Sequence, residues 1–285
     1  MTVRVGSSGA RSSSSGLSEA SRLPELPDVQ VFREYLDATA LHKEVRSVSV
    51  SRERDILEGV SRSRLTDELV GASLLETRRH GKYMFARLSP GGWLVLHFGM
   101  TGYLEFAEDK DAPEHWRLVL RFGENERLAY VCQRLLGRVS YTDDPADFVE
   151  AQGLGPDALS DELDRERFDE DVAGRRGMAK STLMNQAVIA GIGNIYSDEV
   201  LFHARVHPER KLRDLDDGER SKLYREMRRV LRKAIECRAQ PDRMPRSWIT
   251  PCRGKEGECS ACGEELKTLK VNGRTAYICP NRQKK

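Results

Sequence analysis

The spacing of hydrophobic residues along the chain changes from helical to strand-like near residue 45 and back to helical near residue 161. These changes predict where helices and strands lie. In residues 29–41 the apolar positions have helical spacing, which predicts one amphipathic helix. Short apolar runs bounded by Gly, Pro and acidic turns then predict strands as far as about residue 141, at 45–51, 83–88, 93–98 and 117–122. Strands at this spacing favour a β-sandwich or a barrel.

Helical spacing returns in the second half and predicts helices at 161–173, 179–188, 195–204 and 216–237. The last has an apolar stripe of the kind that packs in a core more often than against a partner. The breaker Gly153-Leu-Gly-Pro-Asp157 separates the two halves, and a Pro-containing segment, 241–251, precedes a short unit rich in Cys. We therefore expect domains at 24–145, 146–240 and 241–285, with residues 1–23 outside them.

Charge is distributed unevenly, although the formal net charge of the 285 residues is only +2. Residues 143–171 hold 12 acidic and two basic side chains, a net charge of −10, whereas residues 203–285 hold 22 basic and 12 acidic ones, a net charge of +10. The asymmetry indicates that a polyanion contacts the C-terminal part, although a merely solvated surface gives the same count. No run approaches 18 apolar residues, so we expect no membrane span.

Six Cys without a secretory signal predict a reducing compartment, and metal ligands rather than disulfides. Cys259 and Cys262 form one Cys-x-x-Cys pair, and Cys279 follows after sixteen residues, but Arg282 stands where a second pair would be completed. Two complete pairs would give the tetrahedral sulfur site that zinc prefers. With three thiols the alternatives are a zinc site that Cys252 completes and a hairpin without metal.

Two short segments place glycine at turns. In Gly191-Ile-Gly-Asn194 the glycines allow a tight turn and close approach to a ligand, and the helix expected next would direct its unpaired N–H groups at a phosphate. A helix corner without any ligand would also explain these glycines. In Lys270-Val-Asn-Gly-Arg274 the Asn-Gly pair predicts a β-hairpin, with Arg274 just after the turn.

The string Pro24-Glu25-Leu-Pro-Asp-Val29 joins these motifs in an order typical of one family. Over residues 24–285 the chain resembles the formamidopyrimidine-DNA glycosylase / endonuclease VIII family of DNA glycosylase/AP lyases. The resemblance implies a two-domain α+β fold, with an N-terminal β-sandwich and long helix, a helix–two-turn–helix domain and a β-hairpin zinc-finger-like unit. It also implies one zinc ion, damaged double-stranded DNA as the partner, a monomer and a bacterial cytoplasmic location.

Roles for individual residues follow from the same resemblance. Pro24 aligns with the nucleophile, Glu25 with the acid that protonates the sugar oxygen, and Lys82 with the lysine that assists β-elimination. Arg274 aligns with the finger arginine that grips phosphates and has a role in δ-elimination. The zinc ligands would be Cys259, Cys262 and Cys279.

DNA contacts are implied as well. Three residues align with side chains that fill the gap left by an extruded base: Met100, Arg134 and Leu136. Four align with other DNA-contacting positions: His115, Arg175, Lys180 and Asn194. The chain departs from the family where Cys132-Gln133 replaces an Asp-Pro pair and where Leu136 replaces a Phe. An apolar wedge is still present, so the gap can be filled.

The chemistry needs an amine that is nucleophilic at neutral pH. A terminal amine has a pKa of about 7.7–8.0 and is partly unprotonated, whereas a lysine near 10.4 is almost fully protonated. In the printed chain, however, 23 residues precede Pro24, and an amide-bonded proline has no free amine. Residues 1–22 contain a Ser/Gly-rich run with nothing apolar to bury. We expect Leu23 to mark the true start, read as Met and removed; the alternative is a genuine extension that silences Pro24.

We therefore predict a bifunctional DNA glycosylase/AP lyase of base excision repair, which removes oxidised bases through a proline Schiff base and cuts the strand by β,δ-elimination. The alternative is a catalytically silent DNA-binding member of the family. A zinc-ribbon protein bound to RNA or ribosomes fits the basic finger but not the Pro24 string. Glu25 and Lys82 favour the enzyme, because a mere binder needs neither. The connection from Ile235 to Cys259 is shorter than in typical oxidised-purine enzymes, so oxidised pyrimidines or abasic sites are open as substrates.

Overall fold

The apolar spacing near the N-terminus produces one long helix, α1 (Leu26–Ala40). The structure is a computed structural model that describes residues 23–52, 56–109, 111–254 and 257–285, so the expectations for residues 1–22 lie outside the described residues. Helix α1 begins three residues earlier than the pattern predicts. Pro27 fits the first turn, where an N–H would have no intrahelical partner, and the Asp28 carboxylate accepts the Glu25 N–H at 3.0 Å.

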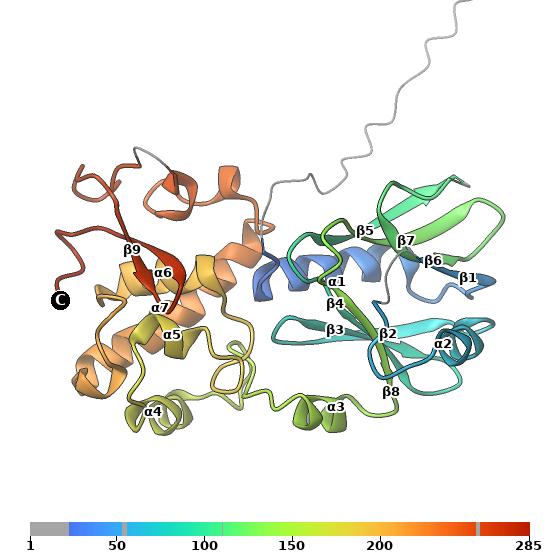
Figure 1. The fold of residues 1–285 in the computed structure, drawn as a ribbon, viewed down its shortest axis with the longest axis horizontal. Coiled ribbons are helices and arrows are strands. Elements are labelled where there is room, and N and C mark those ends of the chain that lie inside the picture. Colours follow the sequence, from blue (N-terminus) through green and yellow to red (C-terminus); the bar gives the residue numbers. More distant parts are fainter. Residues whose placement is uncertain (1–22, 53–55, 110, 255–256) are drawn as a thin grey trace, which may run out of the picture.

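Two four-stranded antiparallel sheets form the first domain and confirm the predicted β-sandwich (Figure 1). One sheet has the order β1-β6-β7-β5: β1 (Ser47–Val50), β6 (Trp116–Arg121), β7 (Glu126–Cys132) and β5 (Gly102–Glu108). The other has the order β2-β3-β4-β8: β2 (Leu74–His80), β3 (Tyr83–Leu88), β4 (Trp93–His97) and β8 (Arg138–Thr142). Helix α1 contacts strands of both sheets.

A short helix, α2 (Arg62–Leu69), lies in the region that the sequence pattern assigned to strands alone, and that expectation is wrong here. The Ser61 side chain accepts the Arg64 N–H at 3.2 Å and so caps the first turn. Leu65 and Leu69 lie four residues apart on one face and are fully buried. Two apolar positions are too few for the period to identify the helix from the sequence.

Helices build the second domain: α3 (Pro145–Ala151), α4 (Arg165–Ala173), α5 (Ala179–Leu183), α6 (Asn194–Ala204) and α7 (Asp217–Glu236). Three single 3₁₀ turns accompany them: η1 (Leu212–Asp214), η2 (Pro241–Arg243) and η3 (Thr250–Cys252). The helix predicted at 179–188 ends at Leu183, because the Asn185 side chain accepts the Ala187 N–H at 3.1 Å and continues the chain as a turn. None of the described helices is long and apolar enough to span a membrane.

Each domain has its own hydrophobic core, and α1 takes part in both. The first core lies between Val29 and Val139, whereas the second lies between Ala158 and Trp248 and includes Leu26 from the first turn of α1. Helix α1 also contacts α7, where Arg238 forms a salt bridge with Glu34. Figure 1 shows α1 reaching from the sandwich to the helical domain. The start of the described chain is therefore fixed at the junction of the two domains.

The Cys-rich unit is a hairpin of β9 (Lys267–Val271) and β10 (Arg274–Ile278), as the Asn-Gly turn predicts. Asn272 and Gly273 both have positive φ, 46° and 77°, which is the geometry of a type I′ turn. A small core of its own holds the hairpin to α6: Phe202, Ile249, Cys259, Leu266 and Cys279.

Two adjacent acids of α6 attach the linker and the hairpin to the helical domain. Glu199 accepts the N–H groups of Ile249 and Thr250 at 3.2 and 2.8 Å, and the Thr250 hydroxyl at 2.6 Å. Asp198 accepts the Tyr277 N–H of β10 at 3.1 Å and the Arg253 guanidinium at 2.6 Å. Both acids are buried, so each is satisfied by groups that come from the C-terminal unit.

We expect Glu199→Gln to lower the free energy of unfolding by about 1–3 kcal/mol, because an amide presents N–H groups to donors that need an acceptor. Urea denaturation gives the change in stability, and limited proteolysis reports whether residues 245–285 become accessible first. The exposed Glu150 provides the matched control, Glu150→Gln. Equal stability of the two variants would show that Glu199 does not hold this segment.

Candidate active site and nucleic-acid interface

The Glu25 carboxylate binds the start of α6 and so joins the first domain to the second. It accepts the N–H groups of Gly193 and Ile195 at 2.7 Å each, and that of Tyr196 at 3.2 Å. Unpaired N–H groups at a helix start carry partial positive charge, and a carboxylate stabilises them. The sequence predicted a phosphate at these N–H groups; the structure corrects this, because the chain's own Glu25 occupies them.

Two glycines make this approach possible. A Cβ at Gly193 would lie 2.4 Å from the carboxyl carbon of Glu25, and one at Gly191 would lie 2.5 Å from the side chain of Leu26. Gly191 also has a φ of +115°, which other residues rarely adopt, and its carbonyl accepts the Leu26 N–H at 3.0 Å. The predicted close approach at these glycines is present, but the approaching group is the N-terminal segment itself.

Lys82 lies in the two-residue turn between β2 and β3, and the turn is fastened to the helical domain. Gly81, with a φ of +55°, donates its N–H to Asp157 at 2.6 Å, and a Cβ there would lie 2.8 Å from Ala190. Arg79 forms a salt bridge with the same carboxylate, and Asp157 is only 5% exposed. A buried acid of the second domain therefore sets the position of Lys82.

Lys82 shares one electrostatic environment with the other catalytic candidates. Burial lowers the pKa of Lys82 below its ordinary value; Glu25 and Asp28 oppose that shift, and Arg274 adds to it. The lysine of a hairpin turn, the acid at the N-terminus and the arginine of the C-terminal finger thus converge. Burial, with Lys82 and Arg138 nearby, also lowers the pKa of His97 to about 4, so this imidazole is neutral at pH 7. Pro24 is buried directly before Glu25.

The three residues predicted to fill the gap of an extruded base lie on two touching turns. Met100 is in the β4–β5 turn, and Arg134 and Leu136 are in the β7–β8 turn. The Arg134 N–H donates to the Thr101 hydroxyl at 3.2 Å, and a Cβ at Gly99 would lie 2.4 Å from the Leu136 backbone. Leu136 is 43% exposed, one of two large hydrophobic side chains so exposed among the described residues. An apolar side chain held out from a rigid turn is suited to insertion into a base stack.

Of the other predicted DNA contacts, Lys180 and Asn194 lie together at the start of α6, whereas Arg175 and His115 belong to other segments. Lys180 is fully buried, and its ammonium bonds to Asp198 and, at 3.1 Å, to the Asn194 carbonyl. Two of the three N–H donors of the ammonium are thus occupied, and the phosphate contact of Lys180 stays a prediction. Arg175 is exposed but donates to the Asp171 carbonyl at 2.7 Å. His115 is half-buried in the β5–β6 connection with a φ of +61°.

Asn194 is the first residue of α6, beside the Glu25 contacts, and its side-chain oxygen has no partner among the described residues. Its DNA contact stays a prediction.

Three cysteines of the finger form a group that could hold a metal ion. The sulfur atoms of Cys259, Cys262 and Cys279 all lie within 4.8 Å of one another. Cys252 packs near them but does not join the group, so the structure gives no support to the expectation that it completes the site. Gln283 fastens this end of the chain instead: it accepts the Cys279 N–H at 3.1 Å and donates to the Val206 carbonyl at 3.0 Å.

Sequence reasoning missed the acids that position the site. Asp157 was assigned only to a chain breaker, and no role was given to Arg79, Asp198 or Glu199. Asp157 and Arg79 are 78 residues apart, so no local period reports their pairing. The available signal was chemical. Asp157 stands between Pro156 and an apolar pair, and Asp198 and Glu199 are adjacent in a largely apolar helix. Acids in such places must find partners if they are buried.

A β-sandwich joined to a helix–two-turn–helix domain and a hairpin finger defines the class of protein to which this chain belongs. Two family models match it, the "Formamidopyrimidine-DNA glycosylase N-terminal domain" over residues 23–139 and the "Formamidopyrimidine-DNA glycosylase H2TH domain" over residues 154–244. The chain is a member of the formamidopyrimidine-DNA glycosylase family.

Relatives from distant organisms support this assignment. A formamidopyrimidine-DNA glycosylase of Acaryochloris marina is 31% identical, over 92% of this chain and 99% of its own length. One from Arabidopsis thaliana is 27% identical, over 92% of this chain and 71% of its own length. The crystal structure of Lactococcus lactis Fpg (MutM) with DNA that contains N7-benzyl-Fapy-dG has a TM-score of 0.83 and 28% identity, covering 92% of this chain and all of that one.

We expect Gly193→Ala to displace the Glu25 carboxylate, because the new methyl group would overlap its carboxyl carbon. Loss of charge-assisted hydrogen bonds at the α6 start should lower the free energy of unfolding by about 2–3 kcal/mol in urea denaturation. Gly174→Ala is the control, because a Cβ at Gly174 meets nothing within 4 Å and its φ is −79°. A Gly193→Ala protein as stable as this control would contradict the importance of the Glu25 contact.

Proposed function

We propose that the protein is a bifunctional DNA glycosylase/AP lyase of base excision repair that acts on oxidised bases in double-stranded DNA. The position of Glu25 carries the proposal: the acid next to Pro24 is held at the start of α6, and it lies near enough to Lys82 to act on the pKa of that amine, as does Arg274. The relatives are named as enzymes of this kind, and solved neighbours hold DNA. We also propose that it works as a monomer in the cytoplasm.

Pro24, once its amine is free, supplies the nucleophile. Its nitrogen lone pair forms a bond to C1′ of the damaged nucleotide, and the bond from C1′ to the base breaks, the base leaving with the electron pair and a proton. The Glu25 carboxylate, once it has taken up the proton that the Pro24 amine loses on attack, gives it to the sugar ring oxygen. The C1′–O bond then opens, and an iminium forms between C1′ and Pro24. A neutral amine is required, which is why a terminal group serves better than a lysine.

Strand cleavage follows from the acidity of the iminium. Removal of a C2′ proton, assisted by Lys82, expels the 3′ phosphate by β-elimination. Burial lowers the pKa of Lys82, which favours its neutral, proton-accepting form. A second elimination expels the 5′ phosphate while Arg274, exposed beside the finger turn, holds the phosphates that flank the lesion.

The damaged nucleotide must leave the stack before Pro24 can reach it. Extrusion costs a few kcal/mol and least at a damaged pair. We propose that Met100, Arg134 and Leu136 fill the gap, because their two turns are joined and Leu136 is held out to solvent. Asn194 and His115 are proposed to contact phosphates nearby. For Lys180 the burial against Asp198 favours a supporting role beneath the helix start.

We propose that the finger metal, when bound, is zinc held by the thiolates of Cys259, Cys262 and Cys279. Three thiols converge, but no fourth His, Cys or acidic group joins them among the described residues. Zinc accepts three protein ligands with solvent in the fourth position. Its contribution would be to crosslink the base of the hairpin, and no step of the reaction passes through it.

The nucleophile is tested with two proteins, one that begins at Pro24 and the printed 285-residue chain. Borohydride reduces the iminium and leaves a covalent adduct with abasic DNA. We expect the first protein to form the adduct and cut the strand, and the second to do neither, because its Pro24 nitrogen is an amide. Intact mass of the protein made from its native gene then shows which form exists. An adduct-free protein that begins at Pro24 and binds DNA would identify the silent DNA-binding alternative.

Chelation tests the role proposed for zinc. We expect at most one zinc per chain by elemental analysis, readily removed by EDTA, with most of the cleavage of abasic DNA retained. The physical reason is that Asp198, Gln283 and the finger core hold the hairpin without metal. The exposed Cys262 gives the variant Cys262→Ser, which should lose zinc and keep cleavage. Zinc that resists EDTA, together with an inactive Cys262→Ser protein, would contradict this.

A further inference from the structure

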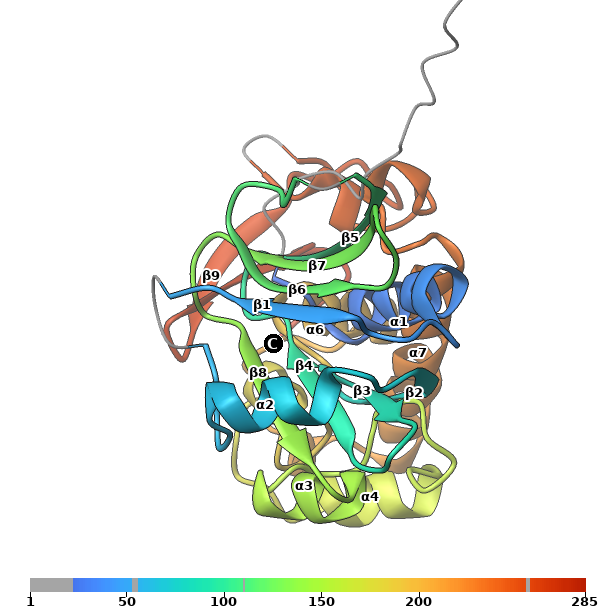
Figure 2. The same cartoon turned by 90° about the vertical axis from the view of Figure 1, so that its right-hand side faces the viewer.

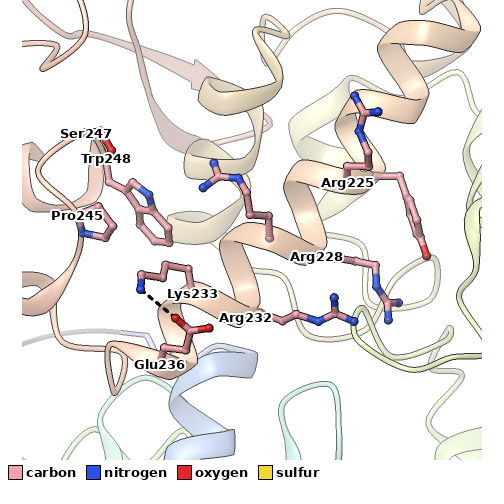
Figure 3. Close-up of a pocket in the computed structure, with 10 residues that line it drawn as sticks. Arg225, Arg228, Arg232, Lys233, Glu236, Pro245, Ser247 and Trp248 are labelled. Carbon is pink, nitrogen blue, oxygen red and sulfur yellow. Dashed lines mark hydrogen bonds and ion pairs between the residues drawn. The ribbon is translucent and has the colours of Figure 1, made fainter.

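A second concentration of positive charge lies on α7, outside the site described above. It lines a groove of about 630 Å³ between α7 and the segment Pro245–Trp248. The lining residues are mostly cationic: Arg225, Arg228, Arg229, Arg232 and Lys233, with Glu236 as the acid (Figure 3). Figure 2 shows α7 and the finger strand β9 on opposite sides of the molecule. No residue of the finger hairpin, β9 or β10, lines this basic groove.

Three of its arginines are exposed, and two of these have no salt-bridge partner among the described residues. Arg225, Arg229 and Arg232 are exposed and recur every three or four residues, so they share one face of α7. Arg229 pairs with Glu226, whereas Arg225 and Arg232 form no salt bridge among the described residues. Arg228 differs, because it donates to the carbonyls of Leu159, Ser160 and Leu163 and belongs to the packing of the domain.

The positive charge continues past the groove toward the end of the chain. Lys222, one turn before Arg225, has a pKa lowered by burial and then by Arg205, Arg282 and Arg225, with Glu226 opposing the shift. Arg282, which stands where a fourth metal ligand would be, lies over the ring of Phe202 at 5.0 Å. A band of cations thus runs from the base of the finger along α7. Cations that repel one another are stabilised by a shared anion.

We propose that the basic groove binds the sugar–phosphate backbone of duplex DNA other than the duplex in the catalytic site. From Arg225 to Arg232 the helix rises about 10 Å. That distance equals about three nucleotide steps of one strand, measured along the axis of duplex DNA. Guanidinium groups pair with phosphate oxygens through two parallel hydrogen bonds. The contact is independent of base sequence, because it reads only the backbone.

Charge and surface composition favour a nucleic acid over an acidic protein. Trp248, the largest apolar side chain of the groove, is only 1% exposed, and the exposed large hydrophobic residues of the described chain, Val70 and Leu136, lie elsewhere. Protein interfaces have an apolar centre, which this groove lacks. The groove would retain the enzyme on undamaged DNA while its catalytic site is occupied, and it is a binding site distinct from the proposed chemistry.

The test uses Arg225→Gln/Arg229→Gln/Arg232→Gln, which removes three charges and keeps good helix formers. A control variant, Arg46→Gln/Arg64→Gln/Arg87→Gln, makes the same change of net charge on exposed residues of the first domain. Each protein is saturated with a short abasic duplex and then titrated with a fluorescent undamaged duplex of the same length, at several salt concentrations.

We expect the unmodified protein and the control to bind a second duplex, and the groove variant to lose it. The slope of log K against log salt should fall in magnitude by up to about 2.7, for three phosphate contacts. Cleavage of the short abasic duplex should be equal in all three proteins. Three outcomes would each overturn the proposal. The unmodified protein could bind only one duplex, the groove variant could bind the second duplex as well as the control does, or polyglutamate could compete as strongly as DNA. If none of the proteins cleaved the abasic duplex, that result would count against the proposed enzyme activity only. The number of undamaged duplexes bound per protein would still report binding at the groove.

Discussion

The contact between the Glu25 carboxylate and the start of α6 is the constraint on which the site depends. A buried carboxylate is costly unless it is hydrogen-bonded, and here three backbone N–H groups of a helix start meet it. The bond fixes the residue next to Pro24 against the second domain, while the rest of α1 packs in the first. This interaction, which needs a glycine at position 193, therefore places the proposed nucleophile at the junction of the two domains.

Two further buried acids repeat this arrangement. Asp157 receives Arg79 and the Gly81 N–H from the β2–β3 hairpin, and Asp198 receives Lys180, Arg253 and the Tyr277 N–H. Each acid of the helical domain thus holds a turn or hairpin that carries a candidate catalytic residue, Lys82 in one case and Arg274 in the other. A side chain on a turn is held in place only when the turn itself is fixed. Removing one partner of a buried ion pair would leave an uncompensated charge and so release the turn.

Local patterns predicted the elements of this structure better than its connections. The apolar runs at 83–88 and 93–98 form β3 and β4, and the Asn-Gly pair forms the finger turn. These features were predictable because hydrophobic periodicity and turn preference depend on residues that are close in the sequence. Helix α2, with two apolar positions, and the early end of α5 were not predicted. The resemblance aligned Lys82 and Glu25 with the site. Asp157 and Asp198, however, bind partners that are distant in the sequence: Arg79 is 78 residues from Asp157, and Tyr277 is 79 residues from Asp198. Lys180, which the resemblance assigns to a phosphate, is buried against Asp198, and no local pattern predicted that partner.

Position 282 shows how a ligand position can change its role. In a hairpin held mainly by metal, replacement of a thiol by a guanidinium would release the finger. Here the finger core, the Tyr277–Asp198 bond, the contact of Asn272 with Ser181 at 2.8 Å and the Gln283 bonds already fix the hairpin. The site can therefore lose one ligand without losing the place of Arg274. The Arg282 guanidinium, which is not a metal ligand, stacks on Phe202 instead. Its charge adds to the band of cations that reaches α7. Arg282 therefore has two effects: it adds no thiol to the three Cys that could hold a metal, and it adds a positive charge near Lys222.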